Sequence, residues 1–246
     1  MVLKNYRTLA STQTWDSTAQ TIITQLPRDF LAQRYYIDMN SSGAVAAGTV
    51  TPVVDGLLKC ITNIKIVAVG EGSSRTIFEV NGADLYHMNL FDYGAPVSPI
   101  TFPLTTGSGQ IHMNFCIDFR CNKLDPDDYS VAIPTYLLST LQLEIEYDTS
   151  ANGYGSNVSS QVFTMGITLI EGIPEPAESF AKNPLMTLLQ KQLSGDSSTG
   201  DEDFDTFFTV GSLIRRSFLL TQTSASAPSD TELTSYTVQS GQIPLM

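Results

Sequence analysis

Hydrophobic and polar residues alternate with a period of two along much of this chain. The stretch IHMNFCIDF (111–119) separates into an apolar side, Ile111, Met113, Phe115, Ile117 and Phe119, and a second side, His112, Asn114, Cys116 and Asp118. The stretch LQLEIEYDT (141–149) alternates in the same way. A period of two is typical of β-strands with one buried face, and the apolar sides are the predicted core.

Further strand candidates lie at 20–26, 30–40, 57–69, 132–138 and 161–172, with a short one beginning at Arg75. At 57–69 the predicted inner side carries Leu58, Cys60, Thr62, Ile64, Ile66 and Ala68. Asn81-Gly82 is a hairpin signal, followed by about one helical turn in ADLYHMN. About nine or ten short strands between Gly- and Pro-containing loops predict an all-β, antiparallel sandwich or barrel.

The pattern changes after residue 172, where Pro174 and Pro176 end the alternation. Asn183 as an N-cap, Pro184 in the first turn and leucines at helical spacing predict one short helix here, followed by an acidic loop. We therefore divide the chain into an N-terminal arm (1–17), a β-domain (18–172), a linker with helix and acidic loop (173–203), and C-terminal strands (204–246).

The charge balance argues against direct contact with nucleic acid. The chain of 246 residues has a formal net charge of −12, and its 13 Lys and Arg residues form no basic run. Nucleic-acid binding needs basic side chains that neutralise phosphates. Half of the net charge comes from the segment between Glu171 and Asp205, which contains eight acidic residues and two lysines.

The three cysteines, Cys60, Cys116 and Cys121, are odd in number and form no C-x-x-C pair, so they predict no disulfide framework. The first 20 residues lack the apolar core of a signal peptide, and no apolar stretch is long enough to span a bilayer. We expect a protein made in a cytosol and soluble by itself.

His112 and Cys116 are the residue types of a cysteine hydrolase or a metal site, but their spacing argues against both. Four residues along a strand span about 13 Å, whereas a nucleophile and its base need hydrogen-bond contact. The acidic run DPDD (125–128) lacks the full calcium-loop pattern and predicts an Asp-capped turn. We therefore expect no catalytic, cofactor-binding or metal-binding residues, no cofactor, and no enzyme activity.

Two groups of basic residues are candidates for contacts. Lys4 and Arg7 lie in the predicted arm and could meet an anionic membrane surface, the alternative being a free arm. Arg215 and Arg216 precede the apolar run Phe218, Leu219 and Leu220. This C-terminal segment offers too few strands to bury that run, so we expect it to pair with the β-domain or with a neighbouring subunit. One of the two arginines pointing inward to a carboxylate is the alternative reading.

The order of strands and loops resembles a known family. NIKIVAVGEGSSRTIFEVNGADLYHMN, then GQIHMNFCIDF, then a D-P-rich loop into IPTYLLSTLQLEIEYD, resembles the jelly-roll major capsid proteins of tailless icosahedral viruses with an internal membrane, the upright jelly-roll lineage that includes adenovirus hexons. The resemblance covers roughly residues 18–172. It implies an antiparallel jelly roll of eight or more strands with one short helix and an extended C-terminal segment.

The resemblance also implies a function. The chain would be a capsid subunit, located in the virion and made in the host cytoplasm. Its partners would be further copies in a trimer or pseudo-hexameric capsomer, other capsid proteins and an internal viral membrane, with no direct nucleic-acid contact. About forty residues follow Thr206, too few for the second roll of double-roll members. The chain is then either a single roll with a C-terminal arm or a shortened double roll. The rival is a spike or other β-sandwich that binds carbohydrate or a receptor.

Overall fold

A computed structural model of the chain describes residues 3–15, 18–45, 48, 50, 56–70, 72–94, 107–120, 122–149, 158–173, 239–240 and 243–244. The chain divides into two compact units, Met1–Lys191 and Gln192–Met246. In the second unit, the two-residue strands β10 (Gln239–Ser240) and β11 (Ile243–Pro244) pair antiparallel. The predicted helix around 184–192 and the remainder of the predicted C-terminal strands lie outside the described residues.

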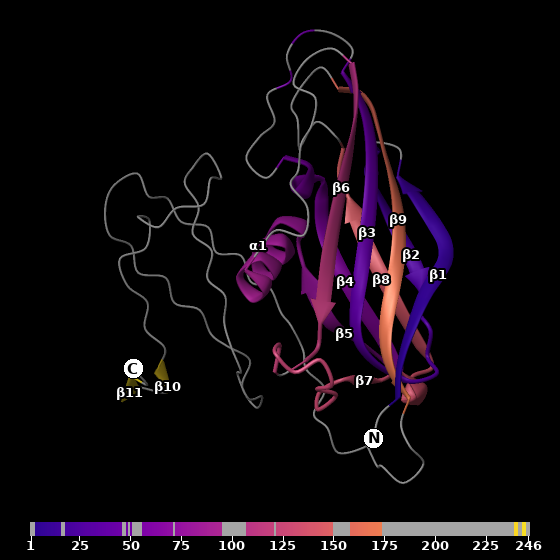
Figure 1. Cartoon of the computed structure of the whole chain (residues 1–246), viewed down its shortest axis with the longest axis vertical. Coiled ribbons are helices and arrows are strands. Elements are labelled where there is room, and N and C mark those ends of the chain that lie inside the picture. The colour runs from indigo at the N-terminus through magenta and orange to yellow at the C-terminus, as the bar shows by residue number, and fades with distance from the viewer. Residues whose placement is uncertain are drawn as a thin grey trace. The chain divides into compact units, whose positions relative to one another are not determined.

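The first unit consists of two antiparallel sheets (Figure 1). Sheet A contains, in spatial order, β1 (Leu3–Trp15), β9 (Val158–Ile173), β3 (Leu31–Val45) and β6 (Gly107–Asp118), with the short β7 (Ile133–Pro134) also paired to β3. Sheet B contains β2 (Gln20–Gln25), β8 (Thr140–Tyr147), β4 (Ile61–Gly70) and β5 (Ser73–Val80).

The pairing of the eight long strands is nested. β1 pairs with β9, β2 with β8, β3 with β6 and β4 with β5, so the first strand meets the last and the middle strands meet each other. Successive pairs alternate between the two sheets. Two four-stranded sheets with this wrapping form a jelly roll. The predicted all-β, antiparallel fold class is confirmed.

One hydrophobic core lies between the sheets. Sheet A contributes Ile37, Met39 and Phe115, and sheet B contributes Ile64 and Leu143, all of them buried. On β6 the predicted inner residues Met113, Phe115 and Ile117 are buried, as is Phe119 directly after it, and on β8 so are Leu141, Leu143, Ile145 and Tyr147. The alternation in the sequence therefore identified the core faces of both strands.

The predicted N-terminal arm is wrong for most of its length. Residues Leu3–Trp15 form β1, an edge strand that pairs with β9 from Leu3↔Ile173 to Trp15↔Phe163. The stretch looked like an arm because few of its residues are apolar. A strand at the edge of a sheet is covered less than a central one and needs fewer apolar residues. Here Leu9 packs partly buried against the core. The roll thus begins at Leu3, not at residue 18.

Two predicted strands have different boundaries or character. Strand β4 begins at Ile61, and the preceding Gly56–Cys60 form a 3-10 turn named η1. A register shift between Ile61 and Asn63 leaves Thr62 exposed, so Thr62 does not share the inner face. The segment 132–138 contains only the two-residue β7, followed by the 3-10 turn η2 (Thr135–Leu137). Pro134 lacks the N–H that would extend the pairing.

The Asn81-Gly82 hairpin is wrong, because the helix α1 (Gly82–Tyr93) begins there. Asn81 is its N-cap, and its side chain accepts a hydrogen bond of 2.7 Å from the N–H of Asp84. Gly94 ends the helix in the left-handed region at φ 72°. Asn and Gly serve a helix start as well as a hairpin, and the local sequence does not separate the two.

Candidate functional site and contact surfaces

The predicted contact residues Lys4 and Arg7 lie on β1, and each forms an ion pair within the subunit. Lys4 Nζ lies 2.7 Å from Asp127 Oδ1. The Arg7 guanidinium lies 2.7 Å from Asp29 Oδ2 and 3.2 Å from Glu171 Oε2. These pairs join the edge strand to two loops and to β9. A role of Lys4 and Arg7 at a membrane stays a prediction.

Glu171 is a charged residue on the inner side of β9, with 0% of its surface exposed. Asn5 Nδ2 donates a 3.1 Å hydrogen bond to Oε2, while Oε1 has no hydrogen-bond partner among the described residues. Burial raises the pKa of this carboxyl group; the Arg7 charge and the Asn5 hydrogen bond oppose the rise, and Asp29 adds to it. The only signal in the sequence was a Glu inside the apolar run ITLIEG.

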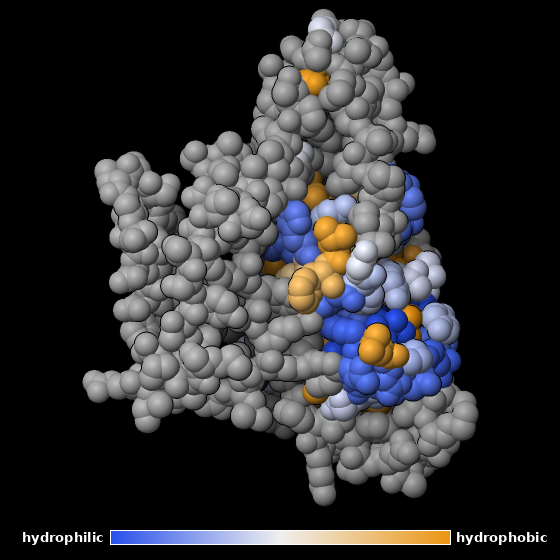
Figure 2. All heavy atoms as spheres, turned by 60° about the vertical axis from the view of Figure 1, so that its left-hand side comes forward, coloured by the Kyte–Doolittle hydropathy of each residue, from blue (hydrophilic) through white to orange (hydrophobic). Residues whose placement is uncertain are grey.

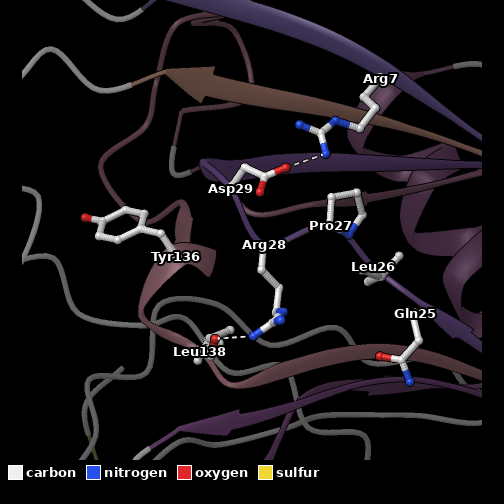
Figure 3. A pocket seen from close by; sticks show the side chains of 8 residues that line it. All are labelled: Arg7, Gln25, Leu26, Pro27, Arg28, Asp29, Tyr136 and Leu138. Atoms are coloured by element: carbon white, nitrogen blue, oxygen red, sulfur yellow. Dashed lines mark hydrogen bonds and ion pairs between the residues drawn. The ribbon is translucent and has the colours of Figure 1, made fainter.

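A pocket of about 530 Å³ opens beside these residues (Figure 3). Arg7 reaches toward Asp29, whereas Arg28 points to the carbonyl oxygen of Leu138 at 2.8 Å and also donates to that of Ser139. These contacts tie the loop before β3 to the segment before β8. The pocket is lined by Arg7, Gln25, Leu26, Pro27, Arg28, Asp29, Tyr136 and Leu138. Its charged side chains, Arg7, Arg28 and Asp29, act as partners in ion pairs and hydrogen bonds.

The second face of β6, which carries His112 and Cys116, points away from the core. His112 is half exposed and pairs with Asp38 of the neighbouring β3. The Cys116 thiol is buried, and burial raises its pKa to about 11. The thiol is therefore protonated near pH 7 and is not poised as a nucleophile.

Helix α1 covers one end of this face. The Asn89 side chain accepts from the Cys116 N–H at 2.7 Å and donates to the Cys116 carbonyl at 2.8 Å. A side-chain amide thus bonds to both backbone groups of Cys116 on the open side of β6, which is an edge strand among the described residues. Figure 2 looks onto this side and shows isolated hydrophobic residues among mostly hydrophilic ones.

A buried ion pair lies next to Tyr93, the last residue of α1. Asp118 and Arg120 are each 4% exposed by side chain, with 2.8 Å between Arg120 Nη2 and Asp118 Oδ2. The Tyr93 hydroxyl donates to the same carboxylate at 2.6 Å, and Lys123 Nζ lies 3.3 Å from it. Burial alone would raise the pKa of Asp118, but Arg120, Lys123 and Tyr93 outweigh it and lower the pKa.

The acidic run 125–128 forms the predicted turn. The side chains of Asn122, Asp125 and Asp128 each accept a hydrogen bond from a backbone N–H two residues further on. In addition, Asp128 Oδ2 accepts from the N–H of Asn122 at 2.6 Å. These carboxylates therefore cap their own loop.

Within the described ranges, no group of three or more His, Cys, Asp or Glu side chains could hold a metal ion. No helix among the described residues is long and apolar enough to cross a membrane. The predicted contact residues Arg215, Arg216, Phe218, Leu219 and Leu220 lie outside the described residues. Sequence reasoning missed Glu171, Asp29 and Asn89, whose roles depend on partners distant in the chain.

No family model matches the sequence, and no curated protein matches it. Solved structures do match. The crystal structure of the major capsid protein of Sulfolobus turreted icosahedral virus aligns with a TM-score of 0.52 at 17% identity, over 69% of this chain and 48% of that chain. A chain from the atomic structure of the same virus gives a TM-score of 0.50 at 18% identity, over 67% and 44%.

A third match, VP54 of the virus PBCV-1 fitted into a reconstruction of the virophage Sputnik, has a TM-score of 0.42 at 10% identity, over 70% of this chain and 43% of that chain. The likeness of fold rests on the first two structures. The chain has the jelly-roll fold found in viral major capsid proteins, as the resemblance had implied. It spans about half the length of the structures it matches.

Proposed function

We propose that this protein is a structural subunit of a viral capsid, which self-assembles into an icosahedral shell. The observation that supports this most strongly is the nested pairing of eight strands in two sheets, together with the likeness to a viral major capsid protein at TM-scores of 0.52 and 0.50. In this role the rolls stand upright in the shell, and loops and terminal segments contact neighbouring copies.

A capsid subunit works by shape and needs no reactive group. The two side chains that could suggest catalysis are engaged otherwise: the Cys116 thiol is buried beneath α1, and His112 pairs with Asp38. The charged residues near the pocket hold loops and strands together through Arg7 and Arg28. These contacts support a structural role and not an enzymatic one.

The proposed partners are further copies of the chain, in a trimer or pseudo-hexameric capsomer, and other capsid proteins. The net charge of −12 favours a shell that does not touch the genome, because association with nucleic acid depends on basic residues. An internal membrane is a further proposed partner, with the virion as the location and the host cytoplasm as the site of synthesis.

The structure describes the first group of proposed contact residues, Lys4 and Arg7, and not the second. Lys4 and Arg7 already pair with Asp127, Asp29 and Glu171, so a membrane contact would have to share these ion pairs. Arg215, Arg216 and Phe218–Leu220 remain proposed contacts with a neighbouring copy, motivated by the apolar run alone.

Light scattering of the purified full chain tests the proposal. The mass is measured across protein concentration and salt, because salt screens the repulsion between acidic subunits. We expect defined oligomers that grow into larger assemblies as concentration and salt rise. A strict monomer under every condition would contradict the proposal and favour a binding module, for which a glycan screen would follow.

A further inference from the structure

The outward side of sheet A has a broad stretch with few charges. We call it the outer face of sheet A. Its residues alternate with the buried ones on each strand, and in register they are Tyr6, Thr8, Tyr36, Asp38, Asn40, Ser42, His112, Asn114, Val162, Thr164, Gly166 and Thr168. Asp38 and His112 are the acidic and basic side chains of this stretch, and they pair with each other. Beyond it on the same outward side, Arg34 donates to the Tyr36 hydroxyl at 3.2 Å and lies over the Tyr36 ring, and Lys4 pairs with Asp127.

This face is accessible over most of its described length. Tyr6 is 65% exposed and Tyr36 is 36% exposed, while Asn40, Ser42 and Thr164 are exposed. The face ends where the segment containing Tyr129 packs against Leu31, and where α1 meets Cys116. Between these limits, a Cβ added to Gly166 would meet no atom within 4 Å, so the middle of the face is open above the backbone.

The outer face of sheet B is different, because it is acidic. On it Lys65 stands among three carboxylates, with 2.6 Å to Glu146, 3.7 Å to Glu79 and Glu144 opposite it in register. One ammonium group therefore faces three carboxylates. The two sides of the same sandwich thus differ in charge, although each is an outward strand face.

Copies of a chain with net charge −12 repel one another over most of their surface. Two copies approach each other most easily where like charges do not face each other. The centres of protein interfaces are also depleted in charged residues and enriched in tyrosine. The outer face of sheet A meets both conditions, with Thr, Ser and Asn side chains and two exposed tyrosines. The outer face of sheet B meets neither.

We propose that the outer face of sheet A is the surface through which this chain contacts a second copy of itself. This inference rests on the proposed capsid function and specifies which side of each roll faces its neighbour. Tyr36 and Tyr6 would be the aromatic anchors, and the acidic outer face of sheet B would stay away from the contact.

Two matched variants test this proposal on the full chain. The first, Ser42→Lys with Thr164→Lys, adds two positive charges to the outer face of sheet A. The second, Thr21→Lys with Gln25→Lys, adds the same two charges to exposed positions of β2 on the outer face of sheet B. Both reduce the net negative charge equally, so they differ only in which face receives the charge.

We expect the first variant to need at least a tenfold higher concentration than the unmodified chain to assemble, as followed by light scattering. The second should assemble at the same or a lower concentration, because it lowers the overall repulsion. Circular dichroism establishes that both are folded. Should the first double variant unfold, Ser42→Lys alone replaces it, and protection of Tyr36 from hydroxyl-radical labelling in unmodified assemblies gives a second readout.

The outcomes separate the two proposals. Equal assembly of both variants, or a Tyr36 that is labelled as readily in assemblies as in free subunits, would overturn the proposed contact face and leave the capsid function standing. An unmodified chain that never assembles would overturn the capsid function and the contact face together.

Discussion

At the scale of single residues, this fold holds several charges in buried positions, and each depends on particular partners. Asp118 is surrounded by Arg120, Lys123 and the Tyr93 hydroxyl. Glu171 has Arg7 and Asn5 on one oxygen, and its other oxygen has no partner among the described residues. The two carboxyl groups therefore have pKa values shifted in opposite directions, which gives opposite dependences of stability on pH.

Replacing Asp118 by Asn should lower the free energy of unfolding by about 3 kcal/mol, because it leaves the buried Arg120 guanidinium without its carboxylate. Since the pKa of Asp118 is lowered on folding, its contribution is present above the unfolded pKa and is lost as the pH falls through the folded pKa. Urea unfolding at several pH values measures both effects.

The matched control is the double variant Asp118→Asn with Arg120→Met, which removes both charges. It should lose less stability than Asp118→Asn alone, since no unpaired charge remains buried. Equal losses in the single and double variants would show that the ion pair is not what Asp118 contributes.

Replacing Glu171 by Gln should leave stability at pH 7 unchanged or raised by about 1 kcal/mol, because it removes a buried charge while Arg7 keeps Asp29. With its pKa raised on folding, Glu171 favours the folded state most below the unfolded pKa, and that advantage is lost as the pH rises through the folded pKa. The unmodified protein should therefore gain stability relative to the variant as the pH falls.

Thermal unfolding from pH 7 to pH 4 tests this expectation. A variant that is clearly less stable at pH 7, and relatively more stable as the pH falls, would show that the charged Glu171–Arg7 pair stabilises the fold.

At the scale of elements, most strands were predictable, whereas for α1 the sequence predicted about one helical turn and not its full length, Gly82–Tyr93. The faces of β6 and β8 follow from alternation alone, because one side of each strand is covered by the core. Helix α1 has no such regular pattern: only Gly82, Ala83, Leu85 and Asn89 are buried along it, and Asn89 is buried because it binds the backbone of a distant strand. The sequence did not identify β1 as a strand for a related reason. Ion pairs and the partly buried Leu9 hold β1 in place, whereas other strands are held by rows of buried apolar residues.

The start of α1 yields a prediction at this scale. A Cβ added to Gly82 would lie 2.7 Å from Ile61 Cβ and 2.8 Å from the carbonyl oxygen of Leu58. Gly82→Ala should therefore cost about 2 kcal/mol, since the helix would have to move away from β4. Chemical unfolding measures the cost, and Gly166→Ala is the control, because its added Cβ meets no atom within 4 Å.

The control should change stability by less than about 0.5 kcal/mol. If Gly82→Ala is as harmless as Gly166→Ala, the helix does not press against Ile61 as described.

At the scale of the whole molecule, the class of fold was predictable from the sequence, and the pairing of strands was not. Spacing and turn residues gave an antiparallel sandwich or barrel, and the resemblance to capsid proteins added the jelly roll. The nested order, with β1 beside β9 and β2 beside β8, depends on contacts between residues up to about 170 positions apart. The difference in charge between the two outer faces likewise emerges only once the strands are in register.

The central claim is that this roll is a building block of a shell, and cryo-electron microscopy of the assembled full chain tests it most directly. We predict rings, sheets or closed shells in which each roll stands upright, with its strands nearly perpendicular to the surface of the assembly. In them the outer face of sheet A contacts a neighbouring copy. Images that contain only separate single subunits, at concentrations and salt that screen the charge repulsion, would contradict the claim.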